Sequence, residues 1–163
     1  MNVYEFKEER QTMIDAAPGA IDQYERMLTA PDTHPWHLSG LYSVILGSNV
    51  DQKRFLPAAL RHLTHSGDGV RLSATTFVGR VGTAADSGPL LVLLSDPKSE
   101  VGYAAARSLG QLGDDRTVIA LELWLRFACK PGDDPAVPQG MAIWVTKARD
   151  EIKARLAALK PAP

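Results

Sequence analysis

The sequence predicts an all-α protein, built as a right-handed α-solenoid (an α–α superhelix) of about four helical hairpins with an N-terminal capping helix. Three observations predict this fold. One segment repeats at a constant offset, the apolar residues of each copy recur at helical spacing, and glycine, proline and aspartate stand where helices would end. A single hairpin leaves an apolar face uncovered, so neighbouring hairpins are expected to stack into one core. We therefore expect a single domain over residues 1–163.

The repeat is clearest between residues 70–82 and 101–113, which align without a gap. The offset is constant, because 101 − 70 = 31 and 113 − 82 = 31. The same offset relates two upstream pairs of leucines: Leu60 with Leu91, and Leu63 with Leu94. Each copy is therefore predicted to contain a first helix ending in Leu-x-x-Leu, a short polar turn, and a second helix ending in Gly-x-apolar-Gly.

Local signals in the second copy agree with this assignment. Val101, Ala105 and Leu109 are spaced i, i+4 and i+8, which places them on one face of a helix. Ser99 is the predicted N-cap of that helix. Gly113 is predicted to end it in a left-handed conformation.

A weaker copy precedes these two. Gly47 pairs with Gly79 at an offset of 79 − 47 = 32, and Leu28 pairs with Leu60 at the same offset. The stretch 4–15 lies before this copy and is predicted to form the capping helix, with its charged run on a solvated face.

A fourth unit is predicted from Asp114 onward, with Asp114 or Asp115 capping its first helix over residues 118–127. Its turn is enlarged over residues 130–135, and its second helix is predicted over 137–159. Small residues recur on the second helices and are expected to let helices approach closely: Ala74, Gly79, Ala104, Ala105 and Gly110.

The segment 90–114 resembles the HEAT-like repeat of the bilin-lyase type. The residues that carry the resemblance are Leu-Leu-Val-Leu-Leu-Ser-Asp at 90–96, Val101, and Ala-Ala-Ala-Arg-Ser-Leu-Gly-Gln-Leu-Gly-Asp at 104–114. The likeness is fair over 54–82 and weak elsewhere. It departs from the family at Gly102, where Arg commonly follows Val, whereas Arg71 retains that pattern. The resemblance implies the fold but not one function, because such repeats occur in scaffolds, lyases, a metal hydroxylase and DNA glycosylases.

Composition excludes several classes of function. Lys and Arg total 18 and Asp and Glu total 19, which gives a net charge of −1 and no basic footprint for nucleic acid. Cys129 is the only cysteine, so neither an intramolecular disulfide nor a cysteine-rich metal site is expected. No apolar run approaches the ~20 residues that span a bilayer, and the N-terminus does not resemble a signal peptide. We expect a cytoplasmic protein without a membrane partner.

The residues that could carry chemistry do not form a recognisable active site. His62 and His65 are three apart and could share a helical face as metal ligands, or they could simply end a helix, where imidazoles favour the negative end of the dipole. The HEAT-like hydroxylases hold iron with His-Glu pairs, and this sequence has no such dipeptide. Cys129 ends an apolar helix and is expected to be an inert thiol. We expect no metal, no cofactor and no catalysis.

The non-core positions of the second helices are the predicted binding residues, on the expected concave groove: Val44, Arg71, Leu72, Thr75, Thr76, Tyr103 and Arg107. This row is small, mostly neutral and partly apolar, which suits a segment of a partner protein. The predicted function is therefore a protein-interaction or scaffold module. The alternatives are that Leu72 and Tyr103 only pack on neighbouring hairpins, that an accessory or lyase-like factor holds a small ligand in the groove, or that nucleic acid binds four arginines: Arg54, Arg61, Arg71 and Arg80.

Overall fold

The computed structural model describes residues 3–127 and 140–159, with side chains from Arg10 onward. Over these residues the chain forms eight α-helices and three short 3-10 helices, and no strand. The all-α prediction is confirmed. No helix in the described part of the chain is long and apolar enough to cross a membrane.

The chain divides into two compact units, Met1–Phe77 and Val78–Pro163, and the division falls within one helix. The elements of the first unit are α1 (Val3–Thr29), α2 (Pro35–Gly47), η1 (Gln52–Phe55), α3 (Leu56–His62) and most of α4 (Asp68–Val81). The second unit contains the end of α4, then η2 (Ala84–Asp86), α5 (Ser87–Val92), η3 (Leu93–Ser95), α6 (Ser99–Leu112), α7 (Asp115–Phe127) and α8 (Met141–Ala158).

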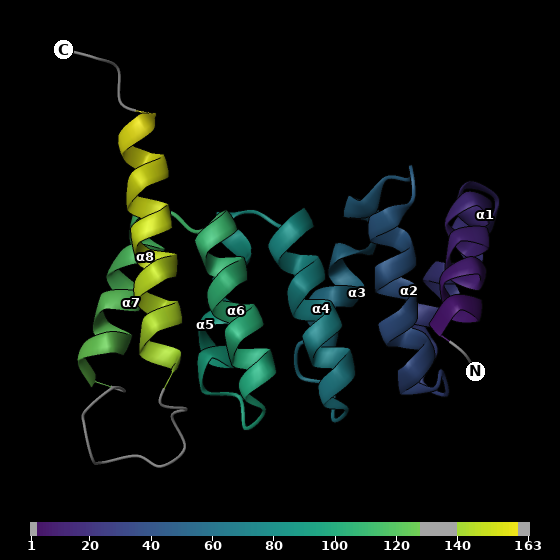
Figure 1. Cartoon of the computed structure of the whole chain (residues 1–163), viewed down its shortest axis with the longest axis horizontal. Helices are drawn as coiled ribbons and strands as arrows, with labels where there is room; N and C mark the ends of the chain where they lie inside the picture. Colours follow the sequence, from purple (N-terminus) through teal and green to yellow (C-terminus); the bar gives the residue numbers. More distant parts are fainter. Residues whose placement is uncertain (1–2, 128–139, 160–163) are drawn as a thin grey trace. The chain divides into compact units, whose positions relative to one another are not determined.

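In the first unit, α1 is one continuous helix that packs along α2 (Figure 1). The prediction of a separate capping helix over 4–15 is therefore wrong. Pro18 lies inside α1 without ending it. The apolar face continues past the proline, because Ala17, Tyr24 and Leu28 are all buried at spacings of seven and four residues. Arg10 secures the pairing by donating from Nε to Ser43 Oγ on α2 at 2.8 Å.

In the second unit, α6 packs against its own first helix α5 and against the next second helix α8 (Figure 1). Helix α7 packs on α8 and contacts α5. The two helices of the fourth predicted hairpin are present, with α8 beginning at Met141. The enlarged turn over 130–135, the predicted helix start at 137 and Cys129 lie outside the described residues.

Equivalent positions of the two clear copies are buried alike. Leu63 and Leu94 are each 1% exposed, and so are Val70 and Val101. Each of these pairs is separated by 31 residues, so the offset found in the sequence relates residues with the same environment. The first helix of each copy is a short α-helix joined to a 3-10 turn: η1 precedes α3, and η3 follows α5.

The end of α6 differs from the prediction. Gly113 has φ −63° and ψ 161°, which is extended backbone and not left-handed. Glycine is needed here for space, because a Cβ would lie 2.7 Å from the carbonyl oxygen of Leu109. The last carbonyls of α6 are satisfied by Arg155 of α8, which donates to the carbonyls of Gly110, Gln111 and Gly113. A side chain from the neighbouring helix thus replaces the expected glycine cap.

Aspartates accept hydrogen bonds from backbone N–H groups near the starts of α6 and α7. The N-cap of α6 is Lys98 and not Ser99, and no side chain caps this helix; Asp96 Oδ1 in the preceding turn accepts from the Lys98 N–H at 2.9 Å. For α7 the prediction of Asp114 is confirmed, since its Oδ1 accepts from the Thr117 N–H at 3.0 Å. That bond lowers the pKa of the Asp114 carboxyl. Thr117 Oγ1 also donates to Ser87 Oγ at 3.2 Å, which joins α7 to α5.

Small residues allow close approach where they were predicted to do so. In the second unit, a Cβ on Gly79 would lie 2.9 Å from Cα of Ser108 on α6. A Cβ on Gly110 would lie 3.3 Å from Cα of Ala148 on α8. The second helices therefore contact one another almost backbone to backbone at these positions.

Candidate binding face on α6 and α8

Two of the predicted binding residues are buried. Val44 is 3% exposed and Thr75 is fully buried, so neither side chain is accessible to a partner. Helix α2 is apolar on most of its circumference, and Val44 follows Leu41 and Tyr42 into the core of the first unit. Periodicity did not separate the two faces of so apolar a helix.

The other predicted residues of the first unit have mostly structural surroundings. Arg71 is half-buried and donates from Nη1 to the carbonyls of His65 and Ser66, at 2.9 and 3.0 Å. It thereby holds the turn between α3 and α4. Leu72 is half-buried, and Thr76 is exposed with its hydroxyl donating to the Leu72 carbonyl at 3.0 Å.

Tyr103 and Arg107 lie one turn apart on α6 in the second unit, and Arg107 is exposed. The ring of Tyr103 packs against Trp144 of α8, with centroids 5.8 Å apart and planes tilted by 42°. Trp144 remains 41% exposed. The alternative that Tyr103 packs on a neighbouring hairpin is thus correct in part, but its partner is itself accessible.

Helix α8 supplies residues that were not identified from the sequence. The buried residues of α8 follow those of α6 at a new offset, because 141 − 101, 145 − 105 and 148 − 108 all equal 40. This offset relates Ile143 to Tyr103 and Lys147 to Arg107. The signal was present in the sequence, but the enlarged turn adds nine residues to the earlier offset of 31. We call these residues, with Trp144, the α6/α8 face: Tyr103, Arg107, Ile143, Trp144 and Lys147.

The α6/α8 face combines accessible apolar area with two cations. Ile143 is 71% exposed, and Lys147 Nζ lies 5.5 Å from the centroid of the Trp144 ring. The two helices lie side by side and run in the same direction (Figure 1). None of the ion pairs among the described residues uses Arg107 or Lys147. An accessible aromatic pair beside unpaired cations is typical of a surface that binds another molecule.

A second cluster lies in the first unit, around His62. Tyr42 Oη and His62 Nδ1 are 2.7 Å apart, and the His65 ring meets the His62 ring edge-on with centroids 5.8 Å apart. Burial raises the pKa of Tyr42, which keeps its hydroxyl protonated as a donor. His65 Nδ1 accepts from the Gly67 N–H at 2.9 Å. The Gly67 N–H occupies the Nδ1 lone pair of His65, so the neutral His65 ring carries its proton on Nε2.

In that tautomer His65 has no lone pair left for a metal ion. In the part of the chain that the structure describes, no group of three or more His, Cys, Asp or Glu side chains could hold one either. His34 Nδ1 accepts from the Trp36 N–H at 3.2 Å and caps α2. The histidines therefore have structural partners.

The folded protein should lose stability as the pH falls below about 6.5. Burial is the main cause that lowers the pKa of His62, and the neighbouring His65 and Arg61 add to it. The unfolded chain then binds more protons than the folded chain between the ordinary value of 6.5 and the lower folded pKa. The contribution of His62 to stability is thus full above this window, declines through it and does not change further beneath it. Urea unfolding of the wild type and of His62→Gln between pH 8 and 5 measures the effect, and equal pH slopes for the two proteins would contradict it.

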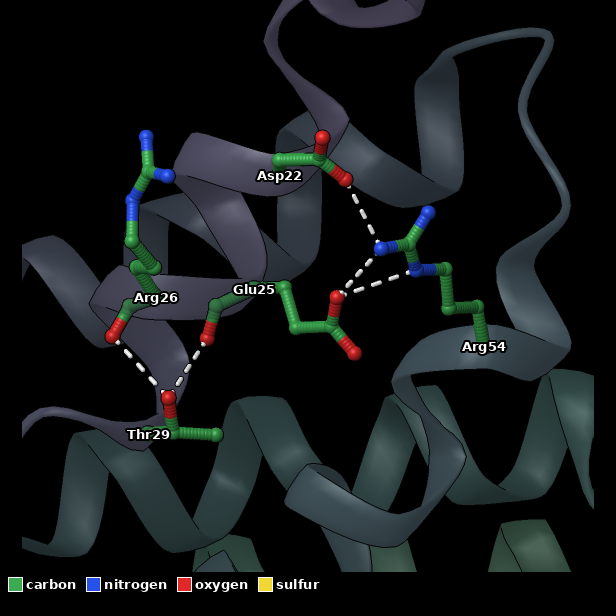
Figure 2. Close-up of polar contacts among 5 residues, drawn as sticks. All are labelled: Asp22, Glu25, Arg26, Thr29 and Arg54. Carbon is green, nitrogen blue, oxygen red and sulfur yellow. Dashed lines mark hydrogen bonds and ion pairs between the residues drawn. The ribbon is translucent and has the colours of Figure 1, made fainter.

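Two of the four arginines considered for nucleic acid are already engaged. Arg54 donates from Nη2 to Asp22 at 2.8 Å and to Glu25 at 2.5 Å, and from Nε to Glu25 at 3.0 Å (Figure 2). The hydrogen bonds that Arg54 donates to Glu25 and Asp22 raise the pKa of its guanidinium. Arg71 is bound to backbone carbonyls, as described above. The remaining pair, Arg61 and Arg80, belongs to different units.

No protein-family model, curated protein or solved structure matches this chain. The likeness to HEAT-like repeats and the function of the α6/α8 face therefore rest on the residues and on their geometry.

Proposed function

We propose that the protein is a HEAT-like repeat module that binds a segment of a partner protein and has no catalytic chemistry of its own. In this proposal the hairpins stack as a right-handed solenoid, the protein works in the cytoplasm, and the partner lies across the second helices. The observation that carries the proposal is the accessible Tyr103–Trp144 pair, flanked by Arg107 and Lys147.

Two observations support the stacked arrangement. Helix α6 packs against both α5 and α8, as a second helix does when hairpins follow one another in a solenoid. Residues equivalent by the repeat are buried alike, which is expected when each hairpin occupies the same environment. In such folds the second helices line one side, and their accessible side chains are the natural contacts for an extended or helical segment.

The energetic argument favours a protein segment over a charged polymer. Aromatic and arginine side chains contribute most of the binding energy at protein interfaces, and the α6/α8 face holds two aromatic rings, Ile143 and Arg107. With 18 basic and 19 acidic residues, the chain lacks the excess of cations that phosphate backbones need.

Replacing Tyr103 by Ala and Arg107 by Glu together is expected to lower recovery of bound protein from a lysate by about ten-fold or more, because both changes remove central contacts. Recovery is measured by quantitative mass spectrometry on immobilised protein. A matched control carries Val92→Ala and Arg126→Glu, which change an exposed apolar residue of α5 and an exposed arginine of α7.

The proposal requires that the control retain its partners and that both variants keep the helical circular dichroism of the wild type. If the Tyr103 and Arg107 double variant recovers the same proteins in the same amounts, the α6/α8 face is not the binding site. A small molecule that co-purifies with the wild type, detected by native mass spectrometry, would instead support the ligand-handling alternative.

A further inference from the structure

The order of charged and aromatic side chains along α6 and α8 suggests what kind of segment the α6/α8 face binds. On α6, Arg107 lies four residues after Tyr103. On α8, Lys147 lies three residues after Trp144. A helix rises about 1.5 Å per residue, so Arg107 is about 6 Å further along α6 than Tyr103, and Lys147 is about 4.5 Å further along α8 than Trp144. Since the two helices run in the same direction, both cations lie on the same side of the aromatic pair (Figure 1).

We propose that the α6/α8 face selects a segment with an apolar side chain and, about 6 Å away along the segment, a carboxylate. The apolar side chain packs on the Tyr103–Trp144 pair, and the carboxylate lies between Arg107 and Lys147. This inference rests on the proposed function, because it specifies the chemistry of the partner that the same face binds.

The two cations are available for such a carboxylate. Among the described residues, neither Arg107 nor Lys147 takes part in an ion pair. Lys147 makes a cation–π contact with the Trp144 ring. Arg107 is exposed on the outer part of α6. Its guanidinium is the group best suited to bind a carboxylate through two parallel hydrogen bonds.

Acidic residues at both ends limit how much negative charge the face accepts. Glu100 lies one turn before Tyr103, where its carboxylate accepts from Ser99 Oγ at 3.2 Å. Glu151 lies one turn after Lys147, and its Oε2 would be 2.5 Å from a Cβ on Gly110. The face therefore runs from acidic to aromatic to basic to acidic. A segment with one acidic residue matches this order, whereas a uniformly acidic segment meets repulsion at both ends.

The test uses synthetic nine-residue Gly-Ser peptides with a central Phe. Two peptides carry Glu two residues before or two residues after Phe, which corresponds to about 6–7 Å in an extended chain. Matched peptides carry Gln or Lys at the same positions. Binding is measured from the shifts of backbone amide and Trp indole resonances in ¹H–¹⁵N spectra of the full chain.

We expect one of the two Glu peptides to bind about three-fold or more tightly than its Gln counterpart, and the Lys peptides to bind most weakly. The shifts should centre on the α6/α8 face. Arg107→Gln combined with Lys147→Gln should abolish the preference for Glu over Gln. Glu151→Gln should strengthen binding of the Glu peptide about two-fold, because it removes a neighbouring negative charge at an exposed position. Raising the salt to 1 M should reduce the preference.

Equal affinity for the Glu and Gln peptides would contradict the proposed binding of a carboxylate between Arg107 and Lys147. The face would then remain only an apolar docking surface. Shifts elsewhere on the chain, or no shifts with any peptide, would also overturn the inference. The proposed function is decided separately, because partner recovery by the Tyr103 and Arg107 double variant does not depend on these peptides.

Discussion

Replacing Gly79 by alanine is expected to destabilise the protein by about 3 kcal/mol, at the upper end of the usual range for overpacked substitutions. The new Cβ would lie 2.9 Å from Cα of Ser108, and a backbone atom cannot move aside as a flexible side chain can. The end of α4 and α6 would have to separate, which would open gaps in the core beside them. Urea unfolding followed by circular dichroism measures the loss.

The matched control is Gly40→Ala in α2. A Cβ on Gly40 meets no atom within 4 Å. Alanine restricts the unfolded chain and favours the helix, so this variant should be more stable by about 0.5–1 kcal/mol. If Gly79→Ala were as stable as the wild type, the close contact between Gly79 and Ser108 would not exist in solution.

Shortening the equivalent leucines, Leu63→Ala and Leu94→Ala, is expected to cost about 3 kcal/mol in each case. Both side chains are 1% exposed, so each substitution removes buried methyl groups and leaves a cavity. Because the repeat places these leucines in the same environment, the two losses should agree to within about 1 kcal/mol. Unfolding free energies of both variants, measured under one set of conditions, test the repeat as well as the core.

Val92→Ala provides the comparison within the same hairpin. Val92 is 75% exposed on α5, only two residues from Leu94, and its replacement should change the unfolding free energy by less than about 0.5 kcal/mol. A large loss for Val92→Ala, or losses for the two leucines that differ several-fold, would mean that the repeat does not relate equivalent positions.

Sequence periodicity predicted the helices well where each helix has one apolar face. The bounds of α6 follow from Val101, Ala105 and Leu109, and the cap of α7 follows from Asp114. It failed in α2, where Val44 is one of several apolar residues on most sides of the helix. Periodicity also predicted a separate helix over 4–15 where the structure has one continuous helix, α1. The sequence does not reveal that the apolar face of α1 continues through Pro18.

Contacts between distant helices could not be predicted from local patterns. Gly113 was expected to end α6 by its own conformation, but Arg155 from α8 supplies the donors for the last carbonyls. Three of the five residues of the candidate site were missed for a related reason. The enlarged turn before α8 changes the offset from 31 to 40, so the row that includes Tyr103 and Arg107 could not be extended to Ile143 and Lys147 until the buried residues of α8 were known.

In the second unit, the end of α4 packs on α6, and α6 packs on α8, with glycines at the closest contacts, and this packing sets the geometry of the α6/α8 face. The most direct test is a nuclear Overhauser measurement between the α-protons of Gly79 and Ser108 in the folded protein. The structure places a Gly79 Cβ position 2.9 Å from Ser108 Cα, so a strong cross-peak between these α-protons is expected. Absence of that cross-peak, with both resonances assigned, would contradict the close packing of α4 on α6.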